Sequence, residues 1–273
     1  MNQAITRALA QIEDTHGVEV LYACEAGSRA WGFGSPDSDY DVRFIYRHRL
    51  DWYLTLDERR DVIDLTRQTR DGVLDVSGWD LRKALRLFAS GNVNLFEWFD
   101  SPHVYCERHG LKRTLLELLP DYFNAKRTAH HYLGIARRAA QAEAGAEAVT
   151  LKRLLYRLRP IAAASWALTR QQMPPTPFHP NLEALDLSPR LRAEVDQLIV
   201  HKRQTREAAR VAPSPALCAW TERALESLAA EARAIASPTP GPWEPLNRLF
   251  LYLAAGPSVL EAADRTRTPD SGA

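Results

Sequence analysis

The chain has 273 residues, of which 45% are hydrophobic and 25% charged, so it carries enough apolar side chains for one large domain or two smaller ones. No apolar run approaches transmembrane length, and the N-terminus lacks the basic start and apolar run of a signal peptide, so we expect no membrane partner. Its three widely spaced cysteines form no zinc or redox motif and favour a reducing, cytoplasmic location.

Charge is spread unevenly along the chain, although the formal net charge is only +1. Residues 110–170 hold 11 Lys or Arg and 4 Asp or Glu, a net charge of +7, whereas residues 1–109 carry −5 and residues 171–273 carry −1. A basic segment inside a nearly neutral protein is consistent with a site for phosphate-bearing ligands. A solvated helix face whose counter-charges lie elsewhere would have the same composition.

Strand patterns dominate the first 80 residues. Runs rich in β-branched and aromatic residues predict four strands, at residues 17–27, 39–46, 59–68 and 72–79. The last two are joined at Asp71-Gly72, a hairpin-type turn. Asp80 is placed to cap a helix over residues 81–90, Gly91 to end it, and residues 94–99 read as another short helix.

Helical spacing of apolar residues takes over from about residue 111. It predicts helices over residues 111–145, 149–170, 188–204, 218–236 and 246–255. Pro160 is expected to bend or divide the second of these, and a proline-rich connector follows it at residues 171–180. The predicted fold is therefore α+β, with a mixed sheet and helices in residues 1–109, a helical domain in residues 110–255 and a mobile tail in residues 256–273.

The stretch "DYDVRFIY" places two aspartates one residue apart in a predicted strand. Alternate side chains of a strand share a face, so Asp39, Asp41, Arg43 and Ile45 point one way and the intervening residues point into a core. Two neighbouring carboxylates repel each other at neutral pH unless a divalent cation neutralises them. An all-oxygen ligand set favours Mg²⁺ or Mn²⁺ over zinc. A solvated edge strand is the alternative interpretation.

Gly27 and Ser28 end the first predicted strand, shortly before the aspartates. A glycine lets backbone amides approach a ligand closely, and the serine hydroxyl adds a donor. Arg29 adds positive charge, unless it is simply solvated. At this spacing from the aspartates, the Gly-Ser step predicts a phosphate seat beside a metal site.

The string "AGSRAWGFGSPDSDYDV" resembles the signature of the DNA polymerase beta-like nucleotidyltransferases, in which Gly-Ser precedes Asp-x-Asp by about ten residues. The longer strings "GSRAWGFGSPDSDYDVRFIY", "DVSGWDLRKALRLFASGNVNLFEWFDSPHVY" and "LKRLLYRLRPIAAASWAL" resemble the predicted nucleotidyltransferase family associated with RNA ligase and RNA repair. The likeness covers roughly residues 15–255. Val93 departs from it, standing where proline is expected, outside the metal site.

The resemblance implies a nucleotidyltransferase catalytic domain with two Mg²⁺ ions, for which Mn²⁺ is a substitute. Asp39 and Asp41 would hold both ions, and a third carboxylate on a neighbouring strand would complete the site. Asp75 is the candidate for this third carboxylate. Asp64 and Asp80 compete with it, but Asp64 is expected on a more distant strand and Asp80 is better explained as a helix cap.

Nucleotide-binding roles follow from the same resemblance. Gly27 and Ser28 would hold the β- and γ-phosphates, with Arg29 and Arg43 assisting. Arg43 has the alternative of pairing with Asp41 or Asp75.

A second group of candidates lies in the predicted helical domain. Lys152, Tyr156 and Arg159 are spaced by four and three residues and share one helix face. The resemblance implies that this face looks into the cleft, where Tyr156 would stack on a base while Lys152 and Arg159 bind phosphates. A basic surface face with a half-buried tyrosine is the alternative.

The activity implied is transfer of a nucleoside monophosphate from a nucleoside triphosphate to a hydroxyl, with release of pyrophosphate, of the EC 2.7.7 type. RNA ends, protein hydroxyls and small molecules are the candidate acceptors, and the oligomeric state is left open. No recognisable RNA-binding motif accompanies the signature. A non-catalytic nucleotide- or RNA-binding regulatory protein, such as an antitoxin-like partner, is the alternative function.

Overall fold

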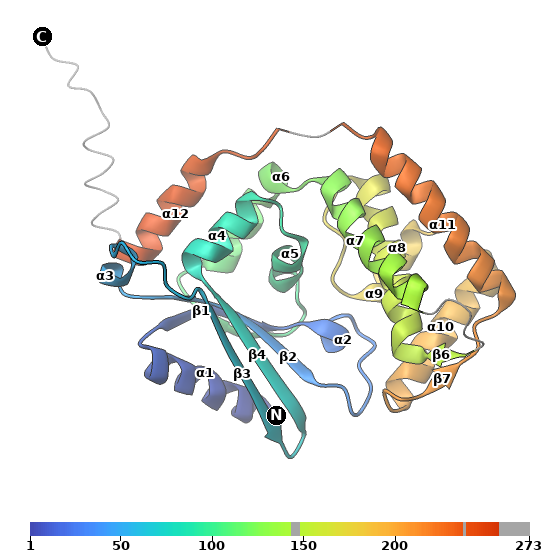
Figure 1. Cartoon of the computed structure of the whole chain (residues 1–273), viewed down its shortest axis with the longest axis horizontal. Coiled ribbons are helices and arrows are strands. Elements are labelled where there is room, and N and C mark those ends of the chain that lie inside the picture. The colour runs from blue at the N-terminus through green and yellow to red at the C-terminus, as the bar shows by residue number, and fades with distance from the viewer. Residues whose placement is uncertain (143–147, 237–238, 257–273) are drawn as a thin grey trace, which may run out of the picture.

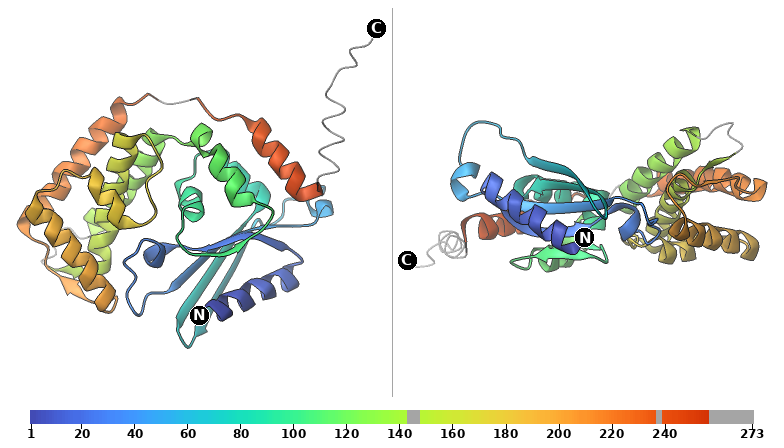
Figure 2. Two further views of the ribbon diagram at one scale, coloured as in Figure 1. Left: turned by 180° about the vertical axis from the view of Figure 1, so that it is seen from behind. Right: turned by 90° about the horizontal axis from the view of Figure 1, so that it is seen from below.

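The computed structural model describes residues 1–142, 148–236 and 239–256. A sheet-bearing half and a helical half lie side by side (Figures 1 and 2). This arrangement confirms the predicted α+β class, with an N-terminal mixed sheet followed by a helical region. The tail predicted over residues 256–273 lies, apart from Gly256, outside the described residues.

The central sheet has five strands in the order β3-β4-β2-β1-β5. Their bounds are β1 Glu19–Glu25, β2 Tyr40–Arg47, β3 Val62–Thr69, β4 Gly72–Asp80 and β5 Val104–Glu107. Four of them correspond to the predicted strands, whereas β5 was not predicted. Strands β2 and β4 are parallel, and the other neighbours are antiparallel.

Helices cover both faces of this sheet, α1 below it and α4, α5 and α6 above it in Figure 1. Their bounds are α1 Asn2–His16, α4 Leu81–Ala89, α5 Val93–Phe99 and α6 Leu111–Tyr122, and two short helices, α2 Gly27–Ala30 and α3 Leu50–Tyr53, lie in the loops. On β2, Val42, Phe44 and Tyr46 pack towards α1, while Ile45 packs towards α4. Because both faces are covered, the strand is apolar at successive positions beyond Asp41 and Arg43.

The helical half is built around a long central helix, α8. Its elements are α7 Ala125–Ala142, β6 Val149–Thr150, α8 Leu151–Arg170, α9 Phe178–Asn181, the 3₁₀ helix Leu182–Ala184, α10 Pro189–Gln204, β7 Arg210–Val211 and α11 Pro215–Ala234. Helix α8 runs undivided through Pro160. The helix predicted over residues 111–145 is two helices, because Asn124 interrupts it and its side chain accepts a hydrogen bond from Arg127 N. Among the described residues, no helix is long and apolar enough to cross a membrane.

Two helices from the predicted C-terminal domain pack into the core of the sheet-bearing half. Leu111 and Leu115 of α6 lie in that core, as do Leu246 and Leu249 of α12, which spans Trp243–Ala255. The chain therefore returns to the first half after completing the helical half. The domain boundary after residue 109 stays a prediction.

Asp80 joins the sheet to the helices above it. Its Oδ1 accepts a hydrogen bond from Arg82 N at 2.8 Å, which caps α4, and its Oδ2 accepts one from the Tyr53 hydroxyl at 2.7 Å. The residue is 1% exposed, and burial raises the pKa of its carboxyl group. Both oxygens are thus committed to structure, as expected for a cap.

Replacing this cap is expected to destabilise the fold. Asp80→Ala should lower the free energy of unfolding by about 2–3 kcal/mol, because a cap is lost and the buried Tyr53 hydroxyl is left without its acceptor. Asp80→Asn keeps a side-chain oxygen that accepts the hydrogen bond from Arg82 N, so it should lower the free energy of unfolding by roughly half as much. Urea denaturation measures both values.

Asp64→Asn is the control, because the Asp64 side chain is 50% exposed on edge strand β3. It should change the free energy of unfolding by less than about 0.5 kcal/mol. Equal stability of Asp80→Ala and the unaltered protein would contradict the capping role.

Candidate functional site

Asp41 and Asp75 lie directly beside each other on neighbouring parallel strands. Asp41 of β2 is paired in register with Asp75 of β4, so both side chains leave the sheet on the same face. Their side chains are 27% and 38% exposed, respectively. Asp39 precedes β2 and is exposed, and no described residue forms an ion pair or hydrogen bond with its carboxylate. The fold therefore places the predicted third carboxylate next to the first pair.

Arg43 supplies positive charge between these two carboxylates. Its Nη2 donates to Asp41 Oδ1 at 3.2 Å and to Asp75 Oδ2 at 2.8 Å. Burial nevertheless raises the pKa of Asp41, and the charges of Asp75 and Asp39 add to this effect, against the opposing effect of Arg43 and Lys152. The site thus carries more negative charge than one arginine offsets.

Gly27 brings the backbone into contact with Asp41. Its φ is 59°, a conformation that favours glycine, and a Cβ there would lie 2.1 Å from Asp41 Oδ2. Gly27 also begins the four-residue helix α2, in which Ser28 is buried. Helix starts expose backbone N–H groups, and the Gly-Ser step lies at one beside Asp41, while its role as a phosphate seat stays a prediction.

Glu25 is a positioning residue that the sequence did not reveal. It is 1% exposed, and its Oε1 accepts a hydrogen bond from Asp41 N at 2.9 Å while its Oε2 accepts one from the Tyr105 hydroxyl. Burial raises the pKa of this carboxyl group. In the sequence, the one indication of this role is that a glutamate stands in an otherwise apolar strand. The residues that Glu25 contacts, Asp41 and Tyr105, are distant in sequence.

Helix α8 brings Lys152, Tyr156 and Arg159 to the other side of the site. Lys152 Nζ pairs with Glu207 Oε2 at 2.6 Å. Arg159 is 5% exposed, pairs with a glutamate of α5, Glu97, at 2.5 Å, and lies over the Trp31 ring with its Cζ 4.1 Å from the centroid. The predicted cations therefore reach this region, but each is already paired.

Glu97 and Glu207 were also missed by the sequence analysis. Glu97 accepts hydrogen bonds from the Trp31 indole at 3.3 Å and from the Tyr132 hydroxyl at 2.5 Å. Glu207 accepts one from the Ser38 hydroxyl at 2.9 Å. Each links segments of both halves, so no local pattern could have identified it.

A cavity of about 320 Å³ opens between these groups. Its lining combines the Asp41–Arg43 pair and the Gly27 backbone with aromatic side chains and a few polar ones: Ala26, Gly27, Trp31, Asp41, Arg43, Trp79, Asn94, Glu97, Trp98, Tyr156 and Thr176. Aromatic walls with convergent polar groups are typical of ligand sites. The cavity can therefore receive a flat ring together with an anionic group.

Arg29 does not line this cavity. Its guanidinium donates to Ser38 O at 2.7 Å and to Asp39 O at 3.0 Å, and its Cζ lies 3.7 Å from the centroid of the Tyr40 ring. The side chain thus fixes the loop before the aspartates.

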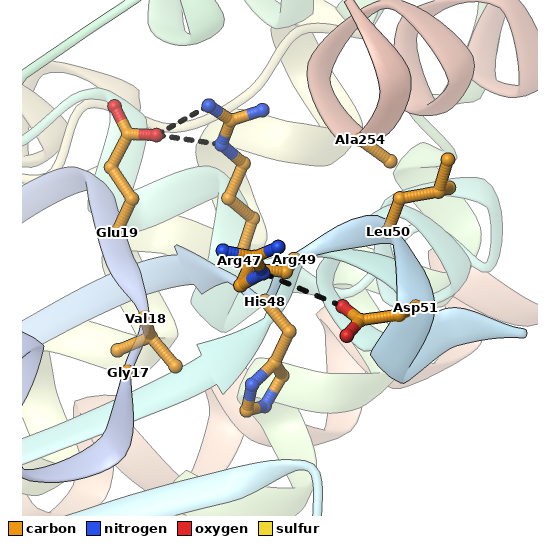
Figure 3. A pocket seen from close by; sticks show the side chains of 9 residues that line it. All are labelled: Gly17, Val18, Glu19, Arg47, His48, Arg49, Leu50, Asp51 and Ala254. Carbon is orange, nitrogen blue, oxygen red and sulfur yellow. Dashed lines mark hydrogen bonds and ion pairs between the residues drawn. The ribbon is translucent and has the colours of Figure 1, made fainter. Parts of the chain in front are cut away.

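A larger cavity of about 550 Å³ lies at the other end of β2 (Figure 3). Arg47 pairs there with Glu19, and Arg49 pairs with Asp51. Six residues along a strand separate Arg47 from Asp41, which is about 20 Å. This cavity is therefore distinct from the carboxylate site, and its cations are paired with their own carboxylates.

The donor set fits a hard divalent cation. Among the described residues, no group of three or more His, Cys, Asp or Glu side chains is arranged to hold a metal ion, and this includes Asp39, Asp41 and Asp75. Asp41 and Asp75 nevertheless offer adjacent carboxylates with uncompensated negative charge, beside a backbone that only glycine allows. Carboxylates and open ligand positions suit Mg²⁺, which takes its remaining ligands from water and phosphate.

Comparison with known proteins identifies a family and similar proteins. The model of the RNA repair pathway DNA polymerase beta family matches residues 1–252. The uncharacterized protein YcgL of Bacillus subtilis (strain 168) is 37% identical over 251 residues, which cover 92% of this chain and 95% of that protein. The crystal structure of a nucleotidyltransferase-like protein from Exiguobacterium sibiricum 255-15 matches with a TM-score of 0.33 and 13% identity, over 98% of this chain and 81% of that one.

The first two matches extend over nearly all of the chain and include the Gly-Ser step, the aspartate pair and helix α8. They confirm the resemblance drawn from the sequence strings. The chain belongs to the RNA repair pathway DNA polymerase beta family.

Proposed function

We propose that this protein is an Mg²⁺-dependent nucleotidyltransferase of the EC 2.7.7 type, which moves a nucleoside monophosphate from a nucleoside triphosphate to a hydroxyl acceptor. Family membership supports nucleotidyl transfer in general. The observation that carries the proposal is the in-register pair Asp41–Asp75, of which Asp41 lines a cavity that Gly27 borders.

Asp39, Asp41 and Asp75 are the residues that would hold two Mg²⁺ ions, or Mn²⁺ as a substitute. Held by these residues, a metal ion would neutralise phosphate charge and lower the pKa of the acceptor hydroxyl. Asp75, the more exposed of the adjacent pair, accepts the proton of that hydroxyl. The acceptor oxygen forms a bond to the α-phosphorus, the bond from that phosphorus to the bridging oxygen breaks, and pyrophosphate leaves.

The triphosphate is held from two sides. Gly27 and Ser28 bind the β- and γ-phosphates through the backbone and the hydroxyl group. Lys152 approaches from α8, where its present partner Glu207 competes with phosphate. Arg43, which is paired with Asp41 and Asp75, would be free to bind phosphate if those carboxylates held a metal ion. Arg29 acts indirectly, through the loop that it fixes.

The base lies against the aromatic wall of the cavity. Tyr156 and Trp31 contact each other there, with ring centroids 5.1 Å apart, and offer faces for stacking. Arg159 reaches a phosphate only if its pair with Glu97 opens. We therefore assign it to positioning Trp31, over which its guanidinium lies.

An RNA end is the proposed acceptor, and the family description supports it. Protein hydroxyls and small molecules are the alternative acceptors. A non-catalytic nucleotide- or RNA-binding regulator is the second candidate function. It is favoured by Arg43, whose guanidinium already lies between the two carboxylates where a cation is expected.

Substitution of the paired carboxylates tests the enzyme hypothesis. Asp41→Asn and Asp75→Asn should each lower the transfer rate by about 10³-fold, because each removes a metal ligand. The measurement follows α-labelled nucleoside triphosphates and pyrophosphate release, with Mg²⁺ and with RNA, protein and small-molecule acceptors. Removal of the metal with EDTA should abolish transfer by the unaltered protein.

Asp64→Asn is the matched control, because Asp64 lies on edge strand β3 and its carboxylate is engaged by Ser77 and Arg60. Its transfer rate should be within about twofold of that of the unaltered protein. Loss of activity in Asp64→Asn but not in Asp75→Asn would reassign the third carboxylate. Saturable Mg²⁺-dependent nucleotide binding without pyrophosphate release would support the regulatory function instead.

Gly27 provides a second test, of the phosphate seat. Gly27→Ala should lower transfer by about 10²-fold, because the added methyl group displaces the Asp41 carboxylate from a backbone that it touches. Gly17→Ala is the control, since Gly17 also has a positive φ, of 61°, but a Cβ there would meet nothing within 4 Å. Both variants should lose about 1 kcal/mol of free energy of unfolding for the positive φ, and Gly27→Ala should lose more because of its contact with Asp41. Equal activity of the two variants would contradict a role for Gly27 at the site.

A further inference from the structure

Helix α7 carries a cationic surface that the proposed chemistry does not use. Its 18 residues, Ala125–Ala142, include no aspartate or glutamate. Arg127, Arg137 and Arg138 are exposed, and no described residue forms an ion pair or hydrogen bond with their guanidinium groups. In contrast, Lys152 and Arg159 of α8 are both paired with glutamates. Three exposed arginines therefore gather on α7, while Arg113 of α6 and Arg153 and Arg170 of α8 are exposed elsewhere in the basic segment.

These side chains form a stripe. Arg127, His131, Gly134 and Arg138 lie within about 60° of one another around the helix, because each residue turns the chain by about 100°. The stripe from Arg127 to Arg138 is about 16 Å long at 1.5 Å per residue. The opposite side of α7 is buried against the core of the helical half. The helix thus presents a single polar, positively charged face.

The stripe starts at the sheet-bearing half and passes the wall of the catalytic cavity. Arg127 Nη1 lies 3.7 Å from the position that a Cβ on Gly91 would occupy, so this side chain sits against the turn between α4 and α5. Burial lowers the pKa of His131, and Arg138 and Arg159 act in the same direction, against Glu97. Glu97 lines the cavity, so the middle of the stripe is electrostatically close to it. In Figure 1, α7 occupies the side of the helical half nearest α5.

Gly134 is a second, independent feature of this face. Glycine inside a helix is unfavourable compared with alanine, so a glycine here needs a reason. Among the residues that the structure describes, a Cβ at Gly134 would meet only Arg138 Nη1, at 3.9 Å, so none of them requires the glycine. It leaves the helix backbone bare between the cationic side chains, where a ligand backbone can approach closely.

We propose that this face, Arg127–His131–Gly134–Arg138, binds the phosphate backbone of a single-stranded RNA whose end is the acceptor. The assignment rests on the proposed function, which supplies an RNA end as substrate. Charge complementarity favours a polyanion, because the stripe has no acidic side chain of its own on α7. Arg127 and Arg138 lie about 16 Å apart along the helix, so the two arginines would contact different phosphates of an extended strand. A membrane surface is disfavoured, since the apolar face of α7 is buried.

Binding of a labelled, unstructured RNA of about 12 nucleotides to the full chain tests this proposal, by fluorescence anisotropy over a range of salt concentrations. Arg127→Gln/Arg138→Gln should weaken binding about tenfold and make the log–log salt slope shallower by about 1.4, the value for two lost phosphate contacts with a single strand. Arg190→Gln/Arg223→Gln removes two exposed arginines from α10 and α11 and should bind within twofold of the unaltered protein, that is, about equally.

Gly134→Leu tests whether the RNA backbone approaches helix α7 closely, because this change leaves the charge of the stripe unaltered. Leucine favours helices and has open space at this position, so the melting temperature should not fall, while RNA binding should weaken about threefold or more. Unchanged RNA affinity in this variant and in Arg127→Gln/Arg138→Gln would overturn the proposal. Equal weakening by the Arg190→Gln/Arg223→Gln control would do the same, because the effect would then be that of net charge.

Nucleotide binding keeps this inference separate from the proposed function. Arg127→Gln/Arg138→Gln should bind nucleoside triphosphate and Mg²⁺ as the unaltered protein does, because the stripe is outside the cavity lining. If nucleotide is bound and turned over but the RNA affinity is unchanged in Arg127→Gln/Arg138→Gln, only the inference about the stripe fails. If the unaltered protein binds no nucleotide, the proposed function fails, whatever the RNA result. Tighter binding of single-stranded DNA of the same sequence, or of anionic vesicles, would overturn RNA as the occupant.

Discussion

Repulsion between two adjacent carboxylates is the constraint around which this structure is arranged. The parallel register of β2 and β4 places Asp41 and Asp75 side by side, and packing gives no compensation for that arrangement. Arg43 offsets part of the charge, while Glu25 and Gly27 fix the backbone on either side of Asp41. Stability alone does not require two adjacent carboxylates. We therefore attribute the electrostatic repulsion between Asp41 and Asp75 to the ligand binding proposed for this site.

The loop between the Gly-Ser step and the aspartates joins the two halves of the molecule. Trp31 O accepts a hydrogen bond from Phe178 N, and the buried ammonium group of Lys202 donates to Ser35 Oγ at 2.8 Å. Ser38 and Lys152 share the carboxylate of Glu207. The segment that carries the signature is therefore also the surface against which the helical half packs. These contacts place α8 opposite the carboxylates.

The basic segment serves two different purposes in the folded molecule. On α8, Lys152 and Arg159 form ion pairs with Glu207 and with Glu97, which lines the cavity, whereas Arg153 and Arg170 are exposed. On α7, Arg127, Arg137 and Arg138 are exposed. The distinction matters for electrostatics, because a paired arginine attracts a distant polyanion much less than an unpaired one. The exposed arginines of the basic segment thus lie on several helices, with three of them together on α7.

The sequence by itself determined the strands that carry Asp41 and Asp75, the helices of the second half and the family. Period-two and helical spacing, together with the local spacing of Gly-Ser and Asp-x-Asp, specify these features over short distances along the chain. Asp80 could likewise be identified as a cap, because capping depends on the residues that immediately follow.

Only the tertiary structure decided what each charged group does. Glu25 and Glu97 depend on partners that are at least 16 residues away, and Glu207, besides its pair with Lys202, depends on the distant Lys152; no local pattern records such distant pairings. The same holds for Arg29, which fixes a loop, and for Arg159, which is held by Glu97. A side chain's chemistry is set by its residue type, but its partner is set by which segments pack together, and that is a property of the whole fold.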